Sequence, residues 1–156
     1  MNLLKGFEVA LLITAPMQAV QGRWQPVAGW RGPLAQAVVG GTTGEYSTMT
    51  DDEHEAVFRA VREAVGDRAA LVAGAGSNDT AHTMHLSEQA QKAGMDGLLI
   101  VTPYYNKPSQ AGVEAHFRSL ADSVDTPVMV YDIPGRSGIP IEPETMISLA
   151  SHPNIV

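Results

Sequence analysis

A repeating alternation of apolar runs and helical patterns restricts the fold more than any other feature of the chain. Apolar runs at 69–73, 97–101 and 127–131 predict buried strands, and their starts lie about 27 and 30 residues apart. This spacing is typical of consecutive βα units in a parallel sheet. A doubly wound sheet and a (β/α)8 barrel both satisfy it. Shorter apolar runs at 11–13 and 37–39 predict two further strands.

Helical patterns lie between these strands. Thr50 and Glu53 have the spacing of a capping box, which predicts that the first helix begins at this point. Apolar residues at helical spacing are expected to form the buried face of that helix: Val57, Ala60, Val61, Ala64 and Val65. A second helix is predicted over 79–93. A third is predicted along the face of Val113, Phe117, Leu120 and Val124, and a fourth near Pro143.

The segment 18–40 departs from this pattern. It contains both tryptophans of the chain, several glycines and two prolines, and it has no helical period. Apart from the short strand predicted at 37–39, we expect a loop-rich insertion.

The charge balance and the absence of cysteine exclude several function classes. Ten Lys and Arg against 17 Asp and Glu give a net charge of −7, which is a poor basis for binding nucleic acid or an anionic membrane. Without cysteine the chain has no disulfide, thiolate or zinc–thiolate chemistry, and we expect a cytoplasmic protein. His82 and His85 stand three residues apart on a predicted helix, but no third ligand is evident, so no metal site is predicted.

Residues able to bind a ligand gather where the predicted strands end. The segments 40–45, 73–78, 102–106 and 131–138 are each rich in hydroxyl groups, glycine or tyrosine. Because parallel strands end at one edge of a sheet, we expect these segments to meet there. Thr hydroxyls, loop N–H groups and Arg136 could then hold a small polar anion. The Gly-x-Gly at 74–76 lacks the full dinucleotide fingerprint, so no nucleotide site is predicted.

Three of these segments carry a resemblance to a known family. The sequences G-T-T-G-E at 41–45, T-P-Y-Y-N-K-P at 102–108 and Y-D-I-P-G-R-S-G at 131–138 resemble the dihydrodipicolinate synthase family. The order and spacing agree through to the H-P-N-I-V at 152–156. The resemblance implies a (β/α)8 TIM barrel, with residues 1–156 as the N-terminal portion of a single barrel domain of about the first five βα units. Residues 18–40 are atypical for the family.

The resemblance also implies an activity: condensation of pyruvate, bound as a Schiff base on a lysine, with aspartate semialdehyde in lysine and diaminopimelate biosynthesis. It makes Tyr131 the general acid and base, and it makes Thr42 and Tyr105 the other members of a proton relay. Tyr105 would reach across a dimer interface, so a homodimer or homotetramer is implied. Thr43 would hold the pyruvate carboxylate and Arg136 the semialdehyde carboxylate. The resemblance implies no cofactor and no metal.

This sequence departs from the family pattern in two ways that bear on activity. The Schiff-base lysine is expected a few residues beyond residue 156, so the fragment alone should be inactive, and a half-barrel with open sheet edges should be unstable or aggregate. The odd composition of residues 18–40 suggests a shifted reading frame or a mis-assembled gene.

A third departure concerns the lysine-inhibition site of the family. His54, Asn78 and Tyr104 match that site. His82 stands where lysine-sensitive members tend to have a glutamate, and Tyr46 replaces a small residue. We therefore predict an enzyme that lysine does not inhibit.

Two other functions remain open. One is another pyruvate-dependent aldolase or lyase of the same superfamily, such as the N-acetylneuraminate lyases or keto-sugar-acid aldolases, although Thr42 and Arg136 favour the synthase. The other is a non-catalytic, truncated remnant.

Overall fold

A five-stranded sheet forms the centre of the structure, in the order β1-β4-β5-β6-β7. The computed structural model describes residues 12–13, 17–20, 23–26, 36–41 and 46–156. Within them, β4 (Gln36–Val39), β5 (Ala70–Gly74), β6 (Gly97–Val101) and β7 (Val128–Tyr131) are parallel to one another. The short β1 (Leu12–Ile13) pairs antiparallel with β4 at one edge.

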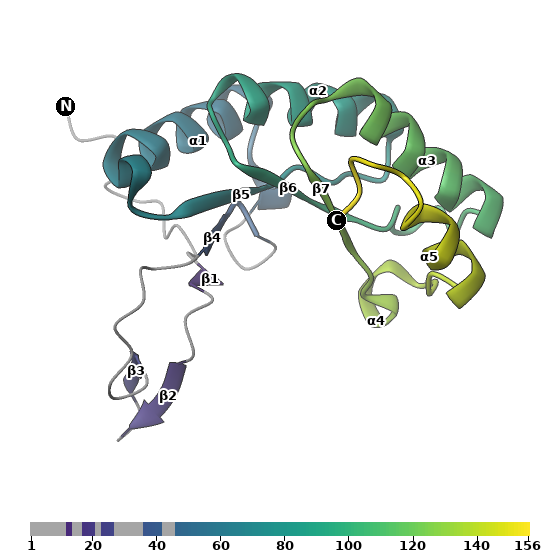
Figure 1. The fold of residues 1–156 in the computed structure, drawn as a ribbon, viewed down its shortest axis with the longest axis horizontal. Coiled ribbons are helices and arrows are strands. Elements are labelled where there is room, and N and C mark those ends of the chain that lie inside the picture. Colours follow the sequence, from purple (N-terminus) through teal and green to yellow (C-terminus); the bar gives the residue numbers. More distant parts are fainter. Residues whose placement is uncertain (1–11, 14–16, 21–22, 27–35, 42–45) are drawn as a thin grey trace.

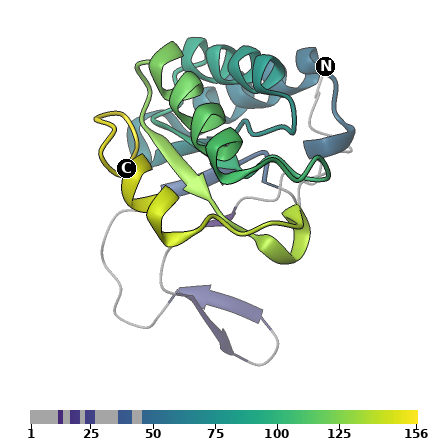
Figure 2. The same ribbon diagram turned by 90° about the vertical axis from the view of Figure 1, so that its right-hand side faces the viewer.

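Three helices cover one face of this sheet (Figures 1 and 2). They are α1 (Asp51–Val65), α2 (Thr80–Lys92) and α3 (Gln110–Ser123), and each connects one parallel strand to the next. Short elements follow the strands: η2 (Tyr46–Thr48) after β4, and the single turn α4 (Pro134–Ser137) and α5 (Pro143–Leu149) after β7. A further turn, η3 (Gly66–Arg68), ends α1. The βα alternation predicted from the sequence is confirmed.

The predicted capping box is present at the start of α1. Glu53 N donates to Thr50 Oγ1, and Thr50 N donates to Glu53 Oε2 over 2.7 Å. The predicted buried face of this helix is partly wrong: Ala64 is exposed, whereas His54 and Phe58 are buried. The buried side chains of α1 therefore include the imidazole of His54. The spacing of apolar residues does not predict this, because histidine is not one of them.

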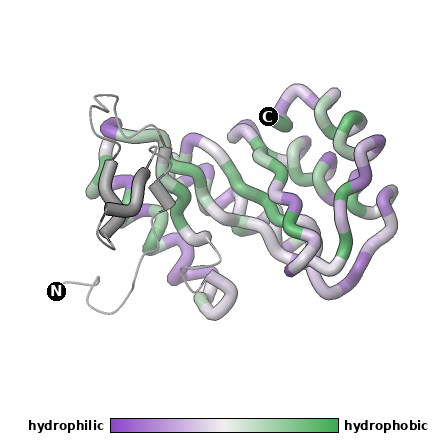
Figure 3. Tube along the Cα trace, turned by 90° about the horizontal axis from the view of Figure 1, so that it is seen from below, coloured by the Kyte–Doolittle hydropathy of each residue, from purple (hydrophilic) through white to green (hydrophobic). Residues whose placement is uncertain are grey.

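The core lies between the sheet and these helices. Leu71, Leu98 and Ile100 of the strands are fully buried together with large side chains of the covering helices: Phe58, Leu86, Phe117 and Leu120. Alternate residues point to the other face of the sheet, where Met129 of β7 is 38% exposed. Figure 3, which views the molecule from below this face, shows apolar strands at its centre. This two-sided apolar pattern is expected of strands from a barrel wall.

The segment that the sequence predicted to be loop-rich contains a second, smaller sheet. β2 (Met17–Val20) and β3 (Arg23–Pro26) form an antiparallel hairpin, with Gln18 opposite Gln25. The hairpin makes no strand pairing with the five-stranded sheet among the residues described. The prediction of a loop is therefore wrong for this stretch. The strand predicted at 37–39 is confirmed as β4.

Two glycines allow the ends of neighbouring strands to approach closely. A Cβ on Gly74 would collide with the carbonyl oxygen of Gly40 at the end of β4. A Cβ on Gly76 would lie 2.5 Å from the backbone nitrogen of Val101 on β6. The Gly-x-Gly at 74–76 thus has a packing role in the sheet, because any side chain there would push the strand ends apart.

A buried histidine links α2 to α3. His116 is 4% exposed, its Nδ1 shares a 2.8 Å hydrogen bond with Thr80 Oγ1, and its ring packs edge-on against Phe117. His116 Nε2 is buried and finds no hydrogen-bond partner in the described part of the chain. Burial lowers the pKa of His116 below its ordinary value, since the protein interior disfavours the charged imidazolium.

We expect this histidine to make the protein less stable in acid. Below about pH 6.5 the unfolded chain binds a proton at His116 that the folded chain resists, so the unfolding free energy falls as pH falls. Above that pH both states are neutral, and the contribution to stability is complete. As pH falls, the unfolding free energy of the His116→Gln variant should decrease less steeply than that of the wild type, by up to about 1.4 kcal/mol per pH unit. Urea unfolding between about pH 5 and 7.5 measures this slope. An unchanged slope in the variant would contradict the assignment.

Candidate active site

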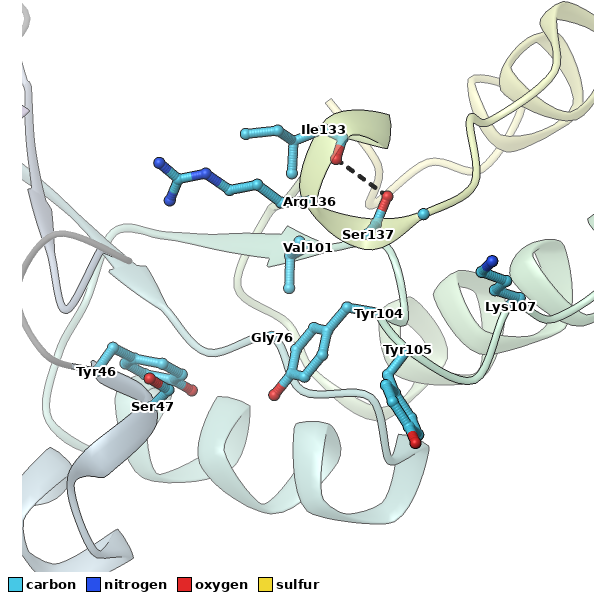
Figure 4. A pocket seen from close by; sticks show the side chains of 11 residues that line it. Tyr46, Ser47, Gly76, Val101, Tyr104, Tyr105, Lys107, Ile133, Arg136 and Ser137 are labelled. Carbon is cyan, nitrogen blue, oxygen red and sulfur yellow. Dashed lines mark hydrogen bonds between the residues drawn. The ribbon is translucent and has the colours of Figure 1, made fainter.

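A pocket of about 950 Å³ opens at the carboxyl edge of the parallel strands (Figure 4). Its wall is built from η2, from the loops after β5 and β6, and from α4 after β7. Three of the four segments predicted to meet at this edge, 73–78, 102–106 and 131–138, contribute lining residues. Of the segment 40–45 only Gly40 and Gly41 are described, and neither lines the pocket. Figure 4 shows Arg136 above the pocket, Tyr46 and Ser47 at the lower left, and Tyr104 to the right of them.

The loop after β6 is held in a fixed shape. Thr102 is fully buried, and both its N–H and its hydroxyl donate to the Tyr131 carbonyl oxygen, over 3.1 and 3.3 Å. Asn106 donates from its backbone N–H to the Tyr104 carbonyl oxygen and from Nδ2 to the Asn78 carbonyl oxygen. Between them Tyr105 has a φ of +68° and is 87% exposed. The loop thus projects the Tyr105 ring outward from a rigid base (Figure 4).

Arg136 extends from the single turn α4 into the pocket. The turn is fixed by Ser137, whose buried hydroxyl donates to the carbonyl oxygens of Ile133 and Ile139. Gly138 ends the turn at a φ of +83°, a conformation that favours glycine. No ion pair or hydrogen bond occupies the Arg136 guanidinium among the residues that the structure describes. Its five N–H donors are available for a carboxylate.

The other residues predicted for the site have different positions. Tyr131 is the last residue of β7, opposite Val101 of β6, and is half-buried rather than part of the pocket lining. Thr42 and Thr43 lie outside the described residues. The structure therefore brings Tyr105 and Arg136 to one pocket and places Tyr131 at the strand end beside it.

A stack of rings forms the wall beside η2. The Tyr46 ring lies parallel to the His54 ring, with their centroids 4.3 Å apart, and His54 Nε2 donates to the Tyr46 carbonyl oxygen over 2.9 Å. His54 is 4% exposed, so it lies behind Tyr46 and does not line the pocket. The Tyr46 hydroxyl is buried and has no hydrogen-bond partner among the residues described, and burial raises the pKa of Tyr46 above its ordinary value.

His82 and His85, the pair considered for a metal, face one carboxylate. His82 Nε2 lies 2.8 Å from Asp51 Oδ1, and His85 Nε2 lies 3.6 Å from Asp51 Oδ2. The hydrogen bond from His82 lowers the pKa of Asp51. Within the described ranges no group of three or more His, Cys, Asp or Glu side chains, this one included, has an arrangement that could hold a metal ion. The pair connects the first turn of α1 to α2.

Sequence reasoning missed several residues of the pocket wall. Ser47, Lys107 and Ile133 line it without having been predicted. Lys107 belongs to the segment T-P-Y-Y-N-K-P already singled out. Pro103 and Pro108, which lie on either side of it in the sequence, are the signal that could have predicted a rigid loop here. Ile133 likewise belongs to the segment 131–138 already singled out, whereas Ser47 lies in η2 and carries no motif of its own.

Comparisons with known proteins decide the family. The sequence profile of the "Dihydrodipicolinate synthetase family" matches residues 33–156. The chain belongs to this family. A 4-hydroxy-tetrahydrodipicolinate synthase from Acidothermus cellulolyticus is 63% identical over 119 residues, which are 76% of this chain and 39% of that relative. The chain thus spans about two fifths of the length of the curated relatives that it matches.

Solved structures of the family share the fold. Dihydrodipicolinate synthase from Acinetobacter baumannii, crystallised with pyruvate, superposes with a TM-score of 0.77 at 39% identity, over 78% of this chain and 42% of that chain. The enzyme from Cyanidioschyzon merolae, crystallised with lysine, superposes with a TM-score of 0.75 at 48% identity over the same shares. The fold is therefore part of a TIM barrel of the dihydrodipicolinate synthetase family. Among the residues described, no helix has the length and apolarity needed to cross a membrane.

Proposed function

We propose that this chain supplies the first part of a 4-hydroxy-tetrahydrodipicolinate synthase, which condenses pyruvate with aspartate semialdehyde in lysine and diaminopimelate biosynthesis. The observation that carries the proposal is the pocket at the carboxyl edge, with Arg136 presented from a rigid turn. The relatives at 58–63% identity named for this reaction support it. The Schiff base forms on a lysine beyond Val156, and we call the protein that includes both parts the complete enzyme.

The chemistry uses hydroxyl groups of this chain. Pyruvate and the lysine amine form a Schiff base with loss of water, and removal of a methyl proton gives an enamine. The enamine carbon attacks the aldehyde carbon, a carbon–carbon bond forms, and the new alkoxide takes up a proton to become a hydroxyl. Tyr131, with Thr42 and Tyr105 as a relay, moves these protons. No cofactor is needed, because the protonated Schiff base accepts the electron pair that the methyl C–H bond leaves behind when its proton is removed.

Two carboxylates have to be recognised. Thr43 binds that of pyruvate, and Arg136 binds that of aspartate semialdehyde through a two-pronged hydrogen bond. The exposed, rigidly mounted Tyr105 suits a role across the interface of a homodimer or homotetramer. One solved relative is described as a monomeric variant. Sedimentation analysis of the complete enzyme would measure how many copies of the chain assemble. A cytoplasmic location fits this biosynthetic role.

A condensation assay tests the function. The complete enzyme should consume pyruvate and aspartate semialdehyde together, and should prefer this aldehyde to N-acetylmannosamine or a keto-sugar acid. Preference for a sugar substrate would favour another aldolase of the superfamily. A stop codon directly after Val156 in the gene would favour a non-catalytic remnant.

We also expect the complete enzyme to resist inhibition by lysine. His54, Asn78 and Tyr104 match the family's effector site, but the Tyr46 ring stacks on His54 and fills the space beside it. His82 offers an imidazole already bonded to Asp51 in place of a carboxylate for the ammonium group. Activity should therefore change little in millimolar lysine. Strong inhibition in this range would contradict the prediction, and Tyr46→Ser with His82→Glu should restore sensitivity.

A further inference from the structure

One side chain of α3 fixes the segment that directly follows the turn carrying Arg136. Gln110, the first residue of α3, donates from Nε2 to the Pro140 carbonyl oxygen over 3.0 Å. Its Oε1 accepts from the Glu142 backbone N–H, also over 3.0 Å. The amide thus holds both sides of Ile141, which is buried. The segment between α4 and α5 is fixed against the start of α3.

A second contact comes from Lys107, in the loop between β6 and α3. Lys107 has a φ of +46°, and a Cβ placed on Gly138 would lie 3.2 Å from Lys107 Cε and 3.9 Å from Cγ. The aliphatic stem of Lys107 therefore lies across Gly138, at the end of α4. Figure 4 shows Lys107 and Arg136 on opposite sides of Ser137. This contact holds the end of α4 at the wall of the pocket, where Lys107 and Gly138 are both lining residues.

These contacts affect the position of the Arg136 guanidinium. Arg136 is exposed and unpaired among the described residues, so nothing at its own tip fixes its position. Its placement depends on the backbone of a four-residue helix, which is too short to be rigid by itself. We propose that Gln110 is a positioning residue, which sets where Arg136 meets the carboxylate of the aldehyde substrate. This inference rests on the proposed function.

The variant Gln110→Met tests the role, because it keeps the length of the side chain and removes both hydrogen bonds. In the complete enzyme we expect the KM for aspartate semialdehyde to rise about 5- to 20-fold, with the KM for pyruvate unchanged, since small displacements of a positioning group are costly. Gln110→Glu, which keeps the acceptor for Glu142 but not the donor for Pro140, should give an intermediate KM. If the methionine variant does not fold, the KM of the Gln110→Glu variant for aspartate semialdehyde tests the proposal instead: a raised KM supports it and an unchanged KM contradicts it.

Gln91 provides a matched control. Its Oε1 accepts from the backbone N–H groups of Asp125 and Thr126 and from the Thr126 hydroxyl, so it holds the loop before β7, at the opposite end of that strand from Arg136. Gln91→Met should lower the melting temperature and leave the KM for the aldehyde unchanged. A purely structural role for Gln110 would give the same result for both variants.

A double-mutant cycle shows whether Gln110 acts through Arg136. In an Arg136→Ala background, Gln110→Met should have no further effect on the KM for the aldehyde. An unchanged KM in the single variant, or fully additive effects in the double variant, would overturn the proposal. A wild-type enzyme without condensation activity would instead refute the proposed function.

Discussion

Replacing Tyr131 with phenylalanine in the complete enzyme is expected to lower kcat by about 10²- to 10⁴-fold, the usual contribution of a positioned acid or base. The phenolic hydroxyl is the only group lost, because the ring stays at the end of β7. The backbone of Tyr131 is fixed by two donors of buried Thr102, so the variant should keep the wild-type geometry. The KM values should change little.

The control for this prediction is Tyr46→Phe. Tyr46 lines the pocket, but its hydroxyl is buried and has no hydrogen-bond partner in the part of the chain that the structure describes, so removing it deletes no described hydrogen bond. Its kcat should match that of the wild type. A Tyr131→Phe enzyme that keeps its kcat within about threefold would assign the proton transfers to another group.

Replacing Arg136 with alanine is expected to lower kcat/KM for aspartate semialdehyde by about 100-fold, through its KM. Hydrogen bonds to a charged group contribute about 1.5–3 kcal/mol, and each 1.4 kcal/mol is a factor of about ten. Arg136→Lys keeps the charge but loses the two-pronged geometry, so it should recover only part of the loss. Steady-state kinetics with each substrate varied in turn separates the two effects.

Trapping of pyruvate on the lysine serves as the control, because we propose that Arg136 binds only the second substrate. The alanine variant should form the pyruvate adduct as the wild type does. Equal loss of pyruvate binding would place Arg136 at the first carboxylate, where we propose Thr43.

The sequence predicted the parallel part of the fold well because each element there has a local signal. The cap at Thr50, the apolar run of β6 and the proline before α5 are properties of a few neighbouring residues. The hairpin β2–β3 has no turn motif and no clear alternation, so its pairing could not be predicted. α4 was missed because four residues are too few to show a helical period.

The site was predicted by motif rather than by geometry. Arg136 and Tyr105 were identified from strand-end segments, and they line one pocket. The attachment by Gln110 of the segment after α4 joins residues about thirty positions apart, so no local pattern contains it. The same holds for His116, whose burial depends on the packing of α2 against α3. Long-range contacts of polar side chains leave no periodic trace in a sequence.

We propose that this chain is one part of a Schiff-base enzyme whose lysine lies beyond Val156. Borohydride reduction with labelled pyruvate, followed by peptide mass spectrometry, tests it most directly. We expect the complete enzyme to carry one pyruvate adduct, on a lysine after residue 156, and residues 1–156 alone to remain unlabelled. A specific adduct on Lys5, Lys92 or Lys107 of this chain would contradict the account.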